Sequence, residues 1–268
     1  MMKKLIVFLL LLSTQVFSSL LNEERKPARA FESILNILSI SPDQSPEAIC
    51  LQLTDCCFQK KERWEFESRF EEQRGVLIPL LRQLGLFKPF YASVNEYDYA
   101  LVLGALRTRV QERIDFLVSE WKRGVRFLHI VFITGERPLR PSENCCNLMS
   151  EAEMMEYVWN QTPMPEELRD VPLQIVDCSA APGCVRTTSD RSLRFWLESD
   201  PIPGTCLVFS SQPYAQYQDL TLRSTLPSSF LVETVSAECE ESQPMSILMD
   251  TLARWFVWTL RQAPVPSK

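Results

Sequence analysis

The sequence is poor in histidine, in glycine and in positive charge, and each shortage excludes a class of function. His129 is the single histidine among 268 residues, so a Ser-His-Asp triad or a zinc site with several histidines would depend on it alone. Lys and Arg number 28 against 34 Asp and Glu, which leaves no basic surplus for nucleic acid. The chain has seven glycines and no G-x-G-x-x-G fingerprint of dinucleotide binding. We expect neither a nucleic-acid partner nor a metal site.

The rest of the composition is typical of a folded protein. Hydrophobic residues make up 46% of the chain, aromatic residues 10% and charged residues 23%. These fractions match globular proteins and exclude disordered, collagen-like and multi-span membrane proteins. The length suits one large domain or two small ones, since domains average about 150 residues.

Residues 1–18 have the features of a secretory signal peptide. Lys3 and Lys4 form a short basic start, and an apolar run from Leu5 to Leu12 follows. The alternative is an uncleaved anchor, which would be the protein's one contact with a membrane. Both alternatives export the domain, so we expect a periplasmic protein or one anchored in the inner membrane and facing the periplasm.

Nine cysteines follow this segment, and an odd number cannot pair completely within one chain in an oxidising compartment. Cys56-Cys57 and Cys145-Cys146 are adjacent pairs. Because we expect the two side chains of such a pair to diverge, each thiol should bond elsewhere rather than to its neighbour. These cysteines indicate a disulfide network or a redox role, whereas Cys178 and Cys206 fit buried apolar positions in strands.

Residues 19–96 are predicted to form a helical region that packs on the main domain. Phe31, Ile34, Leu35 and Leu38 share one helix face, and Ser45-Pro46 is a helix start with a capping serine. Charges of alternating sign from Lys60 to Arg74 predict a long, solvated charged helix.

Residues 97–268 alternate short apolar runs with amphipathic segments, the pattern of a doubly wound, mainly parallel sheet. The expected five strands are Tyr99–Leu103, Leu128–Thr134, Leu173–Asp177, Thr205–Ser211 and Phe230–Val235. The expected helices are Arg107–Arg123, Glu151–Asn160, Ser189–Glu198, Tyr214–Leu226 and Met245–Arg261. Ser150 and Glu153 have the spacing of a capping box. The fold class is therefore α/β, a Rossmann-like sheet of five strands with an N-terminal helical extension.

Ligands of such sheets bind at the carboxyl ends of the strands, where this chain concentrates glycine, hydroxyl and charged residues. The candidate ligand-binding residues are Gly104, Ala105, Gly135, Arg137, Arg186, Thr188, Ser210 and Ser211. Arginine suits the binding of a phosphate or carboxylate. The candidate general acids and bases are Glu136, Asp177 and Asp190, because carboxylates remain when histidine is absent.

Simpler interpretations of these residues stay open. Gly104 and Gly135 fit tight turns, and residues 188–190 fit a helix cap. His129, at the start of its strand, lies at the opposite edge and is expected to be structural.

Six segments in this order resemble the YdcF/SanA/ElyC-like family over residues 97–236. They are Tyr99–Gly104, Arg109 with Arg113, Ile130–Gly135, Ser150–Met155, Arg186–Asp190 and Leu207–Ser211. The resemblance implies a Rossmann-like domain, frequently exported, with members linked to bacterial envelope biogenesis and no general reaction. The chain departs from the family twice: an Asn-Thr-x-Glu-Asn run reads Thr187-Thr188-Ser189-Asp190-Arg191, and Gln212-Pro213-Tyr214 replaces a histidine.

Two functional hypotheses follow from these observations. In the first, the chain is an exported YdcF-like protein that binds a small phosphorylated or nucleotide-like ligand through Arg137 and Arg186. In the second, it is a non-catalytic envelope scaffold that binds an envelope protein through its helical region and cysteines. The sequence identifies no cofactor and does not decide whether the protein is an enzyme.

Overall fold

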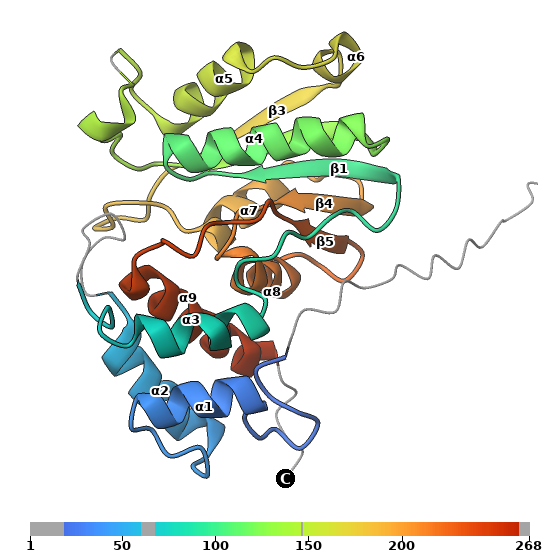
Figure 1. Ribbon diagram of the computed structural model, residues 1–268. Coiled ribbons are helices and arrows are strands. Elements are labelled where there is room, and N and C mark those ends of the chain that lie inside the picture. The colour runs from blue at the N-terminus through green and yellow to red at the C-terminus, as the bar shows by residue number, and fades with distance from the viewer. Residues whose placement is uncertain (1–18, 60–67, 146, 263–268) are drawn as a thin grey trace, which may run out of the picture.

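A parallel five-stranded sheet forms the centre of the computed structural model, which describes residues 19–59, 68–145 and 147–262 (Figure 1). The strand order is β3-β2-β1-β4-β5. The strands are β1 (Glu96–Leu103), β2 (Arg126–Gly135), β3 (Leu173–Cys178), β4 (Thr205–Phe209) and β5 (Leu231–Val235). The predicted Rossmann-like α/β fold is therefore confirmed. The predicted signal peptide, residues 1–18, lies outside the described residues.

Helices cover both faces of the sheet, because its apolar strands must be buried on both sides. One face packs against α4 (Arg107–Lys122) and α5 (Glu151–Gln161), and the other against α7 (Ser189–Leu197) and α8 (Ala215–Thr225) (Figure 1). Alternate β1 residues divide between the two cores: Val102 packs on the α4 side, and Leu101 and Leu103 on the α7 side. Two short elements, a 3₁₀ turn at Pro141–Glu143 and α6 (Glu166–Arg169), lie in connections.

A third core joins the N-terminal helices to the end of the chain. Here α1 (Arg29–Ile37), α2 (Pro46–Cys57) and α3 (Arg74–Gln83) pack with α9 (Met245–Gln262). The rings of Phe31 in α1 and Phe256 in α9 lie 4.9 Å apart, and both are fully buried. The N-terminal helices thus depend on α9 for their apolar contacts.

In the described part of the chain, no helix is long and apolar enough to cross a membrane.

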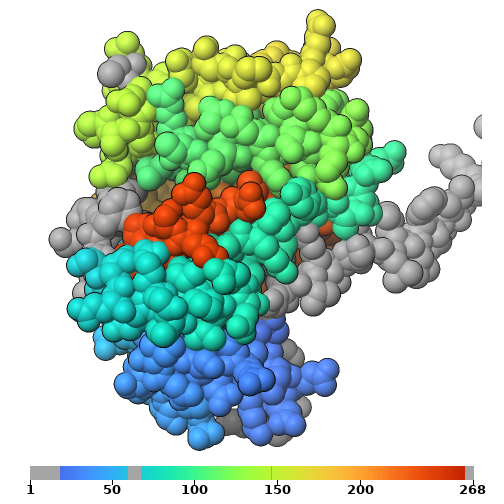
Figure 2. Space-filling model, in the orientation of Figure 1, coloured from blue at the N-terminus to red at the C-terminus, as the bar shows by residue number. Residues whose placement is uncertain are grey.

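Polar contacts fasten this helical layer to the sheet. The Gln212 side-chain amide donates hydrogen bonds to the carbonyls of Gly85 and Lys88 at 3.1 and 2.8 Å, and Gln216 also donates to Gly85. The loop at residues 236–244, orange-red in Figure 2, crosses between the two parts of the molecule. In this loop Glu241 pairs with Arg82 of α3 at 2.6 Å.

Several details differ from the sequence-based expectations. The described end of the predicted charged helix, residues 68–73, forms turns, and α3 begins only at Arg74; residues 60–67 lie outside the description. The Ser150 hydroxyl caps α5 by accepting from the Glu153 N–H, but the Glu153 carboxylate accepts from Met149 instead of closing the capping box.

The expected divergence of adjacent cysteines is wrong for Cys56 and Cys57. Their sulfur atoms lie 3.3 Å apart, so the thiols are in contact. Both residues lie in the last turn of α2, which ends at Cys57. Cys178 and Cys206 are buried strand residues, as expected.

The shared core of the N-terminal helices and α9 predicts a large cost for truncating its central ring. We expect Phe256→Ala to lower the free energy of unfolding by about 3–5 kcal/mol, because it removes a buried ring and leaves a cavity. Leu51→Ala is the control, since Leu51 is 72% exposed, and it should change stability by about 0.5 kcal/mol or less. Chemical denaturation of both variants measures the difference, and equal stabilities would contradict the shared core.

Candidate functional site

A cavity of about 450 Å³ opens at the carboxyl edge of the sheet. Strand order reverses between β1 and β4, so the following helices leave toward opposite faces and open a crevice there. The cavity wall includes the loops after β1 and β2, the start of α7, one side of α8 and part of α9. The size suits a small-molecule ligand, for which cavities of about 300–1,000 Å³ are usual.

The cavity gathers most of the residues predicted from the sequence. Those that line it are Gly104, Ala105, Gly135, Glu136, Arg137, Arg186, Thr188 and Asp190. Asp177, Ser210 and Ser211 are not among the lining residues. Asp177 is exposed on the edge strand β3, where it pairs in register with Thr134. The two serines are buried directly after β4 and bond within the protein.

Arg113 is the most unusual lining residue, because its charge is buried without a carboxylate. Its side chain donates hydrogen bonds to the carbonyls of Leu103 and Gly104 at 2.6 and 3.0 Å, and to the Ser211 hydroxyl at 3.1 Å. The Arg113 Nε is buried and has no hydrogen-bond partner among the described residues. No ion pair joins Arg113 to a carboxylate in the described ranges.

Burial lowers the pKa of Arg113 to about 10, so the side chain remains protonated at neutral pH. The position of Arg113 is also visible in the sequence, although not from the ends of the strands. Val110, Ile114 and Leu117 form the buried face of α4, and Arg113 interrupts that face at helical spacing. A charged residue on a buried helix face requires either a partner within the protein or a ligand.

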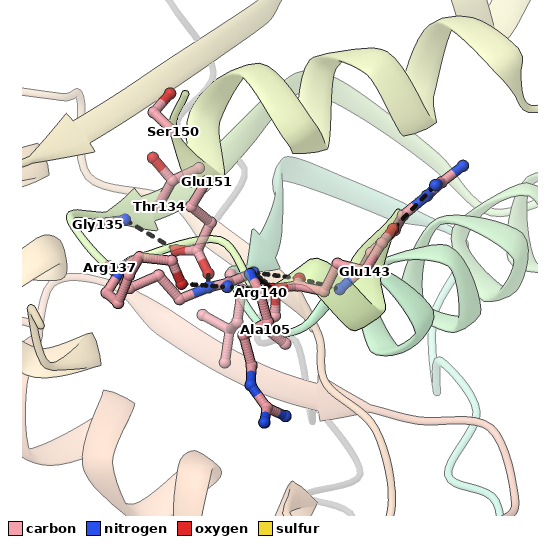
Figure 3. A network of polar contacts seen from close by, with 12 residues as sticks. Ala105, Thr134, Gly135, Arg137, Arg140, Glu143, Ser150 and Glu151 are labelled. Atoms are coloured by element: carbon pink, nitrogen blue, oxygen red, sulfur yellow. Dashed lines mark hydrogen bonds and ion pairs between the residues drawn. The ribbon is translucent and has the colours of Figure 1, made fainter. Parts of the chain in front are cut away.

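Arg137, by contrast, is already fully engaged (Figure 3). Its Nη2 donates to Glu143 at 2.8 Å, and its Nε donates to Glu151 at 2.7 Å. Its remaining hydrogen bonds go to the second Glu143 oxygen and to the carbonyls of Ala105 and Pro138. All five guanidinium N–H groups therefore have acceptors. This geometry favours Arg137 as a residue that positions the loops after β1 and β2.

The Glu151 carboxylate fills the space between the two glycines of the cavity. It accepts from the Gly135 N–H at 3.0 Å, and a Cβ atom on Gly104 would overlap it. A Cβ atom on Gly135 would lie 2.6 Å from the Thr187 Cβ. Both glycines are thus required where the chain approaches itself closely, whatever role they have toward a ligand.

The two carboxylates of this network have opposite pKa shifts. Burial raises the pKa of Glu151 despite its contact with Arg137. Burial would also raise the pKa of Glu143, but Arg137 and the N–H groups of Arg140 and Arg107 hold it below its ordinary value. The ionised carboxylate of Glu143 therefore stabilises the folded state.

The remaining predicted residues lie at the rim. Glu136 is exposed and accepts from the Ala180 N–H at 2.9 Å. Thr188 is the N-cap residue of α7, but its side chain makes no capping hydrogen bond. Asp190 is half-buried in the first turn of that helix, and Arg186 is exposed in the preceding loop. Whether these groups contact a ligand stays a prediction.

The far wall is more apolar and was not predicted. It includes Tyr214, Tyr217, Leu222, Ile247 and Trp258. The Arg109 guanidinium lies 6.0 Å from the Tyr214 ring centroid and donates to the Gln243 side chain at 2.8 Å. Arg109 also pairs with Glu112 at 2.8 Å. The cavity wall therefore has arginine side chains from α4, of which Arg113 forms no ion pair among the described residues, and aromatic rings from α8 and α9.

His129 does not lie near this site. It is exposed within β2, and its ring stacks on Tyr99 at a centroid distance of 5.6 Å. This contact agrees with a structural role.

No family model matches the chain, and searches of curated proteins and of solved structures return no significant match.

The buried network predicts that Arg137 matters for stability. We expect Arg137→Ala to lower the free energy of unfolding by about 3–5 kcal/mol at neutral pH, because it leaves two buried carboxylates without their cation. Lys26→Ala is the control, since Lys26 pairs with Glu24 at an exposed position and its loss should cost about 0.5 kcal/mol or less. Urea denaturation of wild type and both variants measures the loss of unfolding free energy in each variant, and equal losses would contradict the network.

The depressed pKa of Glu143 also predicts a pH dependence. A carboxylate with a lower pKa in the folded state stabilises the protein above its unfolded pKa, near about 4.3, and loses that contribution as pH falls through the folded value. Without Arg137, burial favours protonated Glu143, so the stability gap between wild type and Arg137→Ala should narrow as pH falls from 7 and this carboxylate becomes protonated. Denaturation curves from pH 7 to pH 3 measure it, and a constant gap would contradict the ion pair.

Proposed function

We propose that the protein binds a small phosphorylated or nucleotide-like ligand in the cavity at the carboxyl edge of its sheet. The observation that carries the proposal is Arg113, a buried guanidinium that forms no ion pair and whose Nε lacks a hydrogen-bond partner among the described residues. Burying a charge without compensation is costly, and an anion in the cavity supplies the missing interaction.

Other lining groups suit the same ligand. Arg186 and Arg109 also line the cavity, although Arg109 pairs with Glu112 at 2.8 Å. The Thr188 hydroxyl makes no capping hydrogen bond and offers a donor for a phosphate oxygen, whereas the Thr187 hydroxyl already donates to the Cys178 carbonyl. Tyr214 and Trp258 offer aromatic surface for a base or another flat apolar group. Glu136 and Asp190 at the rim are the carboxylates available as general acid or base, should the ligand react.

The biological setting belongs to the same proposal. Membership of the YdcF/SanA/ElyC-like family, export across the inner membrane and a part in envelope biogenesis rest on the sequence motifs and on residues 1–18. The Rossmann-like fold is consistent with that family but is shared by proteins of many functions.

A ligand panel tests the proposal. The full chain is heated with adenosine diphosphate, inorganic pyrophosphate, S-adenosylmethionine, a sugar phosphate and a lipid-linked phosphate. A compound present at 100 times its dissociation constant should stabilise the fold by about 2.7 kcal/mol. Arg113→Met should weaken binding of that compound by about 10-fold to 100-fold, which is the value of a hydrogen bond to a charged group.

Two further variants keep the test decisive. Arg113→Lys retains the charge but lacks the Nε and the planar fork, so it should fold and still bind more weakly. Arg126→Met is the matched control, because Arg126 begins β2 at the opposite edge of the sheet, and it should bind as wild type does. Absence of any shift, or a shift that persists in both Arg113 variants, would overturn the proposal and favour the non-catalytic scaffold.

A further inference from the structure

The end of α2 carries two thiols in contact, far in sequence from the strand ends that form the cavity. The sulfur atoms of Cys56 and Cys57 lie 3.3 Å apart. A disulfide bond needs a separation of about 2.0 Å, so a small movement brings the two sulfur atoms to bonding distance. Cys57 is the last residue of α2, and Phe58 after it is already extended. A change in the backbone torsion angles here disturbs few hydrogen bonds of α2, because the carbonyls of the last turn have no partner within the helix.

The two thiols lie in different surroundings. Cys57 is completely buried in the core that α9 shares with the N-terminal helices, whereas Cys56 is half-buried. The hydrogen bond with Cys57 lowers the pKa of Cys56, and the same contact together with burial raises the pKa of Cys57. The thiolate is the reactive form of cysteine, so Cys56 is the nucleophile of the pair.

A positive charge is held beside the same helix end. The Arg69 guanidinium donates to the carbonyls of Cys56 and Phe58 at 2.8 and 3.0 Å. It therefore stands next to the terminal turn of α2, where it also contributes to the lower pKa of Cys56. A neighbouring cation of this kind favours the thiolate.

The third cysteine of α2 is too distant to compete. Cys50 precedes Cys56 by six residues, which corresponds to about 9 Å along a helix. Disulfides require Cα atoms within about 7 Å of each other. All eight cysteines in the described part of the chain are free, so Cys56 and Cys57 are available as a pair.

We propose that Cys56 and Cys57 form a redox-active dithiol whose oxidant is a low-molecular-weight disulfide. The Cys56 thiolate attacks one sulfur of the oxidant, forms a mixed disulfide and releases the first thiolate. Cys57 then gives its proton to that thiolate, attacks the Cys56 sulfur and expels the second thiolate. The protein dithiol is oxidised to a Cys56–Cys57 disulfide, and the small disulfide is reduced to two thiol equivalents.

The product is a labile disulfide. The Cα atoms of neighbouring residues lie about 3.8 Å apart. The two Cα atoms joined by a disulfide are usually at least about 4.4 Å apart. The resulting strain raises the reduction potential of the Cys56–Cys57 disulfide, and disulfides of higher potential are reduced more easily. The pair therefore suits reversible oxidation rather than permanent cross-linking.

Mass spectrometry of the full chain tests this chemistry. The protein is incubated with oxidised glutathione, alkylated, and digested with trypsin, which yields the fragment from Ala30 to Lys60 with all three cysteines of α2. We expect this fragment to lose two hydrogens, keep one alkylatable thiol and regain the other two after reduction with dithiothreitol. Exposed Cys184 should carry a glutathione adduct and serves as the internal control.

Three variants assign the roles of the thiols. Cys57→Ser should retain glutathione on Cys56, Cys56→Ser should form neither adduct nor disulfide in this fragment, and Cys50→Ser should behave as wild type does. A stable glutathione adduct on wild-type Cys56, or three free thiols in the wild-type fragment while Cys184 is modified, would overturn the proposal. The wild-type fragment decides the question even where the buried Cys57→Ser change prevents folding.

Discussion

The burial of two guanidinium groups at the carboxyl edge of the sheet is the constraint around which the site is organised. Arg137 meets this constraint within the protein, because Glu143 and Glu151 neutralise it and carbonyls accept its other hydrogen atoms. Arg113 donates to carbonyl and hydroxyl oxygens and forms no ion pair among the described residues, and the charge of Glu151 acts on it without direct contact. Both residues line the cavity, and this difference in compensation is why the proposed ligand binding rests on Arg113 and not on Arg137.

The loops after β1 and β2 follow from the Arg137 network. Glu151 is the first residue of α5, and the Ser150 cap fixes the position of that helix start. The Glu151 carboxylate then holds both the Gly135 N–H and Arg137, while Arg137 holds the Ala105 carbonyl. One internal carboxylate thereby occupies the space between the glycines, which leaves the rest of the cavity for the proposed anion.

Helix α9 closes the cavity from the other side. Arg254 of α9 lines the cavity, pairs with Asp250 at 2.8 Å and lies over the ring of Phe58 at the end of α2. The Gln212 side chain holds the carbonyls of Gly85 and Lys88 and so fastens the helical layer to the sheet.

Sequence patterns predicted the fold and the edge of the sheet at which the cavity opens, but not the contacts of each side chain. Apolar runs and helix caps are local, so strands such as Leu173–Cys178 were found almost to the residue. The ion-pair partner of an arginine cannot be predicted from its sequence neighbours. The sequence does not show which of Arg137 and Arg113 has a carboxylate partner, and only the folded chain brings Glu143 and Glu151 to Arg137. Ser211 was expected to end its strand and to bind a ligand, but β4 ends at Phe209, and the Ser211 hydroxyl accepts a hydrogen bond from Arg113.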